Sequence, residues 1–367
     1  MIKELVLHLG DTKTGSTSIQ NALVRGLCQI PGKTLIYPTT NNHVAMARTL
    51  TQERRFSQRA ARFKRLRSAF EKSDADIGIV SAEHFQFVDP DVLVEAIETY
   101  WPAFRDRLRL VAYVRPHADK LVSTFSERVK LGSRLPSLEA FFETANAIDT
   151  FNYSQRFGAW RRVFGERFIL RPFVRSELHQ GDAICDFVKI LAGDDNFRIT
   201  GKVAANTSLS VAQLALLREV HEVINDKIGT GIGPRYLEAR GAVGRLVGEY
   251  MRQHQLGQDS PKLAIPKPMA EAVRARYAPD AEALDAAFFA NTPMSDALNA
   301  LDRKLVDAPQ SLKASDHFAP EVIEATRIQA HVLADLVALD PQGIRSTIGK
   351  ARASEAEADG TKGKKTA

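Results

Sequence analysis

A stretch near the start of the chain, Leu5–Gln20 (LVLHLGDTKTGSTSIQ), constrains the fold more than any other. An apolar run stops at Gly10 and gives way to a turn rich in Gly, Ser, Thr and Lys. From Ser16 onward, apolar residues recur on one face at helical spacing. The stretch therefore predicts a buried parallel strand, a tight loop and a helix N-terminus. The free N–H groups and the dipole of such a helix end favour an anion.

The position of Lys13 separates this loop from the ATP-binding P-loop. In the GxxxxGK[ST] pattern the Lys directly follows the second Gly. Here Gly15 is followed by Ser16 and Thr17, and Lys13 stands two residues before Gly15. The stretch is thus not a Walker A loop as written. A glycine-rich turn without a ligand is the alternative that a single loop motif leaves open.

Four further apolar runs predict strands, and segments with helical periodicity separate them. The predicted strands are Thr34–Tyr37, Asp76–Ala82, Arg109–Val114 and Phe168–Val174. Helical periodicity then dominates from Leu209 onward. Strands that alternate with helices predict an α/β fold with a central, mainly parallel sheet, followed by a helical C-terminal part.

Polar residues follow two of these strands at the edge where open α/β sheets bind ligands. Glu83 and His84 come directly after the 76–82 strand, and a carboxylate there is a candidate general base. Its alternative role is to cap the following turn or to pair with an Arg. Arg115 ends the 109–114 strand, and Ser123 lies two turns into the next helix, so the two side chains could grip one phosphate. A surface ion pair at Arg115 is the alternative.

The net charge of +6 over 367 residues favours anionic ligands without naming one. Much of the excess lies in a basic helical segment, residues 48–72, which is either a solvated helix face or a rim that gathers an acidic acceptor or a cofactor's phosphates. Because stacking aromatics are few there, a nucleic-acid partner is not expected. The two cysteines match no disulfide or zinc pattern. No stretch approaches a transmembrane span, so we expect a cytoplasmic protein, or one peripheral to the inner membrane.

Three pieces of sequence in this order, HLGDTKTGSTSIQ, SAEHF and YVRPHADKLVSTF, together resemble the sulfotransferases that use 3'-phosphoadenosine 5'-phosphosulfate (PAPS). The similarity is strongest to bacterial members and to the heparan-type Golgi enzymes. It covers residues 1–210 well and extends loosely to 290. The resemblance implies a P-loop-type, three-layer α/β fold and a bacterial carbohydrate sulfotransferase.

The resemblance also implies roles for particular residues. The family's first loop holds the 5'-phosphosulfate, and its matching residues here are Lys13, Thr14, Gly15, Ser16, Thr17 and Ser18. Arg115 and Ser123 match the pair that grips the 3'-phosphate. Lys13 would stabilise the leaving phosphate, and Glu83 or His84 would be the base. The product would be adenosine 3',5'-bisphosphate, and no metal is expected.

The acceptor, expected to be a hydroxyl of a glycan or polysaccharide, is not readable from the sequence. Asn206 and Ser208 resemble a recurring feature of bacterial members without a defined role. The predicted domains are a sulfotransferase-like domain over 1–300, with a helical subregion at 209–300, a helical extension over 301–345 and a disordered tail over 346–367. A nucleotide-dependent P-loop kinase and a non-catalytic anion-binding protein of the same fold remain alternatives.

Overall fold

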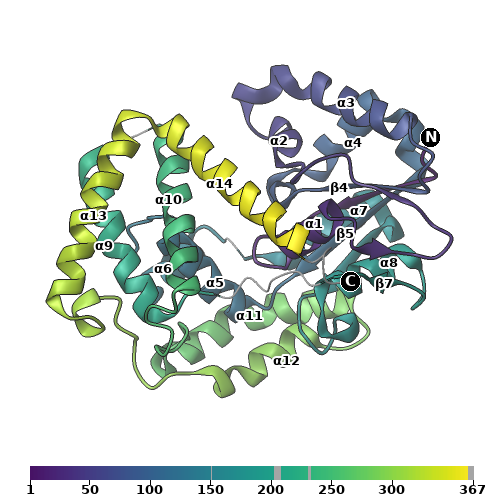
Figure 1. The fold of residues 1–367 in the computed structure, drawn as a ribbon. Helices are drawn as coiled ribbons and strands as arrows, with labels where there is room; N and C mark the ends of the chain where they lie inside the picture. Colours follow the sequence, from purple (N-terminus) through teal and green to yellow (C-terminus); the bar gives the residue numbers. More distant parts are fainter. Residues whose placement is uncertain (150, 202–207, 230–232, 363–367) are drawn as a thin grey trace. The chain divides into compact units, whose positions relative to one another are not determined.

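A computed structural model describes residues 1–149, 151–201, 208–229 and 233–362 (Figure 1). The chain forms two compact units, and each is assembled from three separate segments. The first comprises residues 1–117, 151–206 and 277–299; the second comprises 118–150, 207–276 and 300–367. The two units therefore interleave along the chain, and the predicted division at residue 300 stays a prediction.

A five-stranded sheet forms the centre of the first unit, with its strands in the order β3-β4-β1-β5-β6. All neighbouring strands in this order run parallel. The strands are β1 (Glu4–His8), β3 (Leu35–Ile36), β4 (Ile77–Ser81), β5 (Leu108–Val114) and β6 (Phe168–Pro172). Each falls on one of the predicted apolar runs, which confirms the α/β class with a parallel central sheet. Strand β4 is buried at every residue, as expected for a strand covered on both faces.

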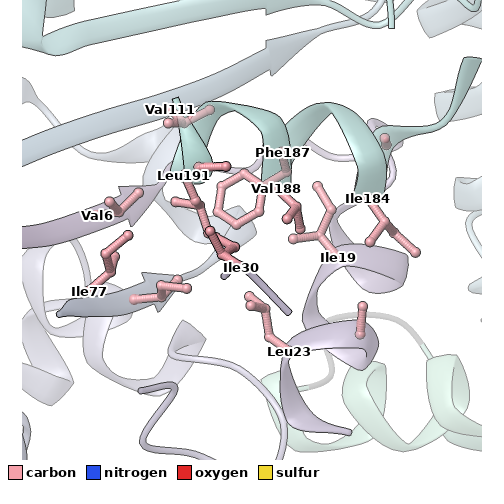
Figure 2. Close-up of a cluster of buried hydrophobic side chains, with 14 of the residues drawn as sticks. Val6, Ile19, Leu23, Ile30, Ile77, Val111, Ile184, Phe187, Val188 and Leu191 are labelled. Atoms are coloured by element: carbon pink, nitrogen blue, oxygen red, sulfur yellow. The ribbon is translucent and has the colours of Figure 1, made fainter. Parts of the chain in front are cut away.

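One face of the sheet is covered by helices α1 (Ser16–Val24) and α8 (Ala183–Ala192). Figure 2 shows Ile184, Phe187 and Val188 of α8 close to Ile19 of α1, beside Val111 of the sheet. Helix α8 is fixed at its start by the Asp182 side chain, which accepts hydrogen bonds from two backbone N–H groups of the first turn. The contacts between α1, α8 and the sheet hold the N-terminus of α1 close to the end of β1.

The opposite face is covered by helices α3 (Arg59–Glu71) and α4 (Pro90–Tyr100). A Cβ at Gly78 of β4 would lie 2.8 Å from the Phe70 ring of α3, so strand and helix approach closely there. Trp101, just after α4, donates its indole N–H to the Phe63 carbonyl. Helices therefore cover both faces, which is the layered arrangement that the sequence predicts.

The strand order places a switch point at the carboxyl ends of β1 and β5. The chain leaving β1 continues toward β3 on one side of the sheet, whereas the chain leaving β5 continues toward β6 on the other. Loops that diverge from adjacent parallel strands leave a crevice between them, and ligands of open α/β sheets bind there. The residues that follow these two strands are Leu9–Gly15 and Arg115–Pro116.

The remaining elements of the first unit surround this framework. A short antiparallel pair joins β2 (Cys28–Gln29) to β7 (Arg198–Ile199). The basic segment follows β3 as predicted helical structure: α2 (Val44–Ala47), two 3₁₀ turns over Arg48–Leu50 and Glu53–Gln58, and then α3. The other helices of this unit are α7 (Tyr153–Phe164) and α12 (Pro293–Asn299).

The second unit is helical, as predicted for the C-terminal part. Figure 1 shows α9 (Val211–Ile228), α10 (Pro234–Gln253) and α13 (Pro320–Leu339) side by side, and α9 packs against both others. Helix α6 (Leu138–Ala147) also belongs here. Helices α5 (His117–Lys130) and α11 (Lys267–Phe288) each contain residues of both units.

The described part of the chain ends in helix α14 (Pro341–Lys362). Ala, Arg, Glu and Lys are frequent in this stretch, and all four have high helix propensity. The predicted disordered tail over 346–367 stays a prediction.

Candidate functional site: the loop after the first strand

The loop Gly10–Gly15 connects β1 to the N-terminus of α1. Its two glycines are required by close contacts. A Cβ on Gly10 would lie 2.5 Å from the Ser16 hydroxyl oxygen. Gly15 is the N-cap of α1 with φ +78°, and a Cβ there would lie 3.0 Å from both the Phe173 ring and the Ala183 Cβ. The backbone at both glycines is therefore packed closely against neighbouring side chains.

Two of the hydroxyls predicted to hold the cofactor make contacts within the loop. Thr14 and Ser16 donate their hydroxyl hydrogens to the Asp11 carbonyl oxygen, at 2.6 and 3.2 Å. Both side chains are buried. In this structure they shape the loop rather than point to the surface. Thr17 is exposed and Ser18 is half-buried in the first turn of α1.

Lys13 and Arg115, both predicted on separate grounds, come together. The Arg115 guanidinium donates a hydrogen bond of 3.1 Å to the Lys13 carbonyl. Lys13 itself has φ +70°, a left-handed conformation that costs an L-residue about 1–2 kcal/mol. A strained residue of this kind persists only where its surroundings hold it, and such residues cluster at binding sites. The contact joins the loops that leave β1 and β5.

Phe173, directly after β6, is a member of the site that the sequence did not indicate. Its backbone N–H donates to the Val114 carbonyl at 2.7 Å, which fixes it beside the end of β5. Its ring contacts the position of Gly15 and lies 5.9 Å from the Arg115 guanidinium carbon. Phe173 thus lies beside both the loop and the arginine. The only sequence feature that could have indicated Phe173 is its position, as an aromatic residue, at the end of a predicted strand.

Asp11 and Arg156 form a second unpredicted part of the site. The Asp11 side chain is 2% exposed, and its Oδ2 lies 2.9 Å from Arg156 Nη2 of helix α7. The two residues are 145 positions apart, so no local pattern connects them. The only sequence feature that could have indicated this pair is the Asp in GDTKTG, because a buried carboxylate within an anion-binding motif needs a cation nearby to compensate its charge.

Glu83 and His84 begin the 3₁₀ turn Glu83–Phe87 that follows β4. Glu83 is half-buried, and its Cγ lies 3.5 Å from where a Gly10 Cβ would stand, so its side chain reaches the loop. His84 instead bonds through Nε2 to the Thr51 hydroxyl at 2.6 Å. Burial, reinforced by Arg48 and Arg55, lowers the pKa of His84 to about 4. The two adjacent candidates therefore face different partners.

A buried polar cluster supports the ends of β1 and β4, and it too was missed. The Ser81 hydroxyl lies 2.8 Å from His8 Nδ1 and accepts a hydrogen bond of 3.0 Å from the Gln20 amide. The Ser81 N–H donates to His43 Nδ1 at 3.1 Å. Burial lowers the pKa of His8 to about 3 and that of His43 to about 4. Since these side chains are buried, the cluster is a neutral structural network beneath the loop at pH 7.

Three further residues were singled out from the sequence: Ser123, Asn206 and Ser208. Ser123 is on α5 in the second unit, where its hydroxyl donates to the Lys120 carbonyl at 3.1 Å. Its pairing with Arg115 stays a prediction. Asn206 lies outside the described residues. Ser208, also in the second unit, accepts a hydrogen bond from Lys262 Nζ at its backbone carbonyl.

The chain matches no protein-family model, no curated protein and no solved structure. Among the described residues, no helix combines the length and apolar character needed to cross a membrane. The same part of the chain holds no group of three or more His, Cys, Asp or Glu side chains arranged to bind a metal ion. A function for this chain must therefore be inferred from the loop Gly10–Gly15 and the residues that contact it.

Proposed function

We propose that the chain is a PAPS-dependent sulfotransferase that transfers a sulfuryl group to a hydroxyl of a carbohydrate. The observation that carries the proposal is the contact between Arg115 and the Lys13 carbonyl. It brings the side chain expected at the 3'-phosphate against the loop expected at the 5'-phosphosulfate. The two cations come from adjacent parallel strands and lie at the switch point of the sheet.

The residues present fit PAPS as a ligand. The first turn of α1 begins at Gly15 and offers backbone N–H donors to a phosphate. Gly15 has no side chain to cap that turn, and no acidic residue lies in it. Lys13 and Arg115 add positive charge. This donor set suits an anion with two phosphate-bearing ends.

The proposed chemistry assigns one task to each group. When bound, PAPS supplies a sulfuryl group whose bond to the 5'-phosphate oxygen breaks as a bond to the acceptor oxygen forms. Lys13 stabilises the negative charge that develops on the released phosphate. Glu83 accepts the proton that the acceptor hydroxyl loses, a role worth about 10²- to 10⁴-fold in rate.

Glu83 is the better candidate for the base because its side chain reaches the loop. His84, by contrast, is bonded to Thr51, and its pKa of about 4 makes it a weak base at neutral pH. In labelled-PAPS transfer to a panel of polysaccharides, Glu83→Gln should lose at least 100-fold in kcat. His84→Gln should lose much less. Equal losses in both variants would contradict the assignment.

Binding of adenosine 3',5'-bisphosphate, measured by calorimetry, tests the proposed donor. Lys13→Ala and Arg115→Ala should each weaken binding by about 10- to 100-fold, the usual value of a charged hydrogen bond. Exposed Lys72 on the basic segment provides a matched control, and Lys72→Ala should bind as the wild type does. Absence of binding to the intact protein would refute the proposal.

Two further measurements separate the two alternative functions from the proposed one. A P-loop kinase would be stabilised in a thermal-shift experiment by ATP with Mg²⁺ and not by the bisphosphate. A non-catalytic anion-binding protein would show no change in any activity on Glu83→Gln, and its ligand affinity would fall steeply with added salt.

A further inference from the structure

The loop carries a buried negative charge at the position where an anion is proposed to bind. Asp11 lies between the two loop glycines, and its side chain is almost completely buried. A carboxylate next to an anion-binding backbone opposes the ligand by charge repulsion. Either this carboxylate is neutralised by a neighbour, or the loop binds anions poorly.

Arg156 is placed to provide that neutralisation. Its Nη2 lies 2.9 Å from Asp11 Oδ2, and its side chain is only 25% exposed. The guanidinium carbon stands 4.5 Å from the centre of the Phe157 ring and 5.3 Å from that of Tyr153. Both rings belong to the same helix, α7, and Tyr153 and Phe157 are buried. The aromatic faces hold the cation in one place beside the carboxylate.

The orientation of Asp11 also matters for the shape of the loop. Its carbonyl oxygen accepts the hydroxyls of both Thr14 and Ser16. Asp11 therefore takes part in the ion pair with α7 through its side chain and in the hydrogen bonds of the loop through its carbonyl.

We propose that Arg156 is a positioning residue of the anion-binding loop, which acts by neutralising the buried Asp11 carboxylate beside the proposed anion. This inference depends on the anion-binding role in the proposed function and adds a residue to it. Arg156 acts through Asp11, so its contribution should disappear when the carboxylate is removed.

The test is a double-mutant cycle measured by calorimetry with adenosine 3',5'-bisphosphate at pH 7. Arg156→Met leaves the carboxylate without its guanidinium and should weaken binding at least tenfold. Arg156→Met combined with Asp11→Asn should recover most of that loss. Arg162→Met removes an exposed Arg from the same helix and should leave binding unchanged.

A pH series separates charge neutralisation from a general structural effect. The affinity ratio between Arg156→Met and the double variant should approach one as the pH falls, because protonation neutralises the Asp11 carboxylate that has lost the Arg156 guanidinium. A merely structural role for Arg156 would leave that ratio constant. Wild-type affinity in Arg156→Met, or a double variant as weak as the single one, would overturn the inference.

Two further outcomes are also decisive. If Arg156→Met does not fold, Asp11→Asn alone provides the test: the inference expects binding at least as tight as in the wild type, and a tenfold loss overturns it. If the wild type does not bind the bisphosphate, the proposed function fails. The same series with inorganic pyrophosphate then tests the inference separately, and a wild type that binds neither compound overturns both.

Discussion

Substitution of Gly15 by Ala should destabilise the protein by more than its backbone conformation alone explains. Gly15 has φ +78°, where an L-residue costs about 1–2 kcal/mol. The added Cβ would also stand 3.0 Å from the Phe173 ring and from the Ala183 Cβ. Overpacking of this kind costs about 1–3 kcal/mol, so the total expected loss is about 2–5 kcal/mol.

Gly26 provides a matched control for the conformational part. Its φ is +64°, and a Cβ there would meet nothing within 4 Å. Gly26→Ala should therefore lose only the conformational part, about 1–2 kcal/mol. The difference between the two variants isolates the contact of the loop with Phe173 and Ala183.

Urea unfolding at pH 7 measures both variants, and binding of the bisphosphate measures the effect on the site. Gly15→Ala should also weaken binding, because relief of the contact displaces the loop backbone, whereas Gly26→Ala should not. Ala183→Gly in the Gly15→Ala background should recover part of the difference in a double-mutant cycle. If the two alanine variants lose equal stability, the close packing of the loop is not energetically important and the reasoning is refuted.

Two further predictions concern buried groups below the site. The lowered pKa values of His8 and His43, about 3 and about 4, mean that the unfolded state binds protons more readily between pH 6.5 and 4. The free energy of unfolding, measured with urea, should therefore fall as the pH falls through this window, by up to about 2 kcal/mol per histidine at pH 5. A wild type whose stability depends on pH no more than that of the His8→Gln/His43→Gln variant would contradict this. The buried Asp186 accepts hydrogen bonds from Arg171 and from the Tyr113 hydroxyl, so Asp186→Ala should cost about 3–5 kcal/mol. Asp195→Ala, which breaks the surface pair with Lys189, should cost less than about 1 kcal/mol, and similar losses in both would argue against a buried network.

The strands and most helices could be predicted because local sequence patterns encode them. The five strands of the sheet coincide with short apolar runs bounded by polar or turn residues. Helix α4 follows a capping Asp and a Pro, and α13 begins at Pro320, which are both helix-start signals.

The candidate site could be predicted only where its residues lie next to a strand end. Lys13, Glu83 and Arg115 each follow a predicted strand, so parallel pairing brings them to one edge of the sheet. The choice between Glu83 and His84 could not be made this way, because both residues directly follow the same strand and the sequence pattern does not distinguish them. It depends on which partner each side chain meets.

The sequence by itself determined the parallel sheet, its loop between two glycines, and the edge at which the charged residues lie. These follow from hydrophobic periodicity and from turn chemistry, which act over a few residues. Only the tertiary structure decided that Arg156 neutralises Asp11, that Phe173 packs against Gly15, and that Thr14 and Ser16 bond to the loop itself. The ion pair and the ring contact join positions more than a hundred residues apart, and the hydroxyl bonds depend on the exact path of the loop. Contacts of both kinds are set by packing in three dimensions.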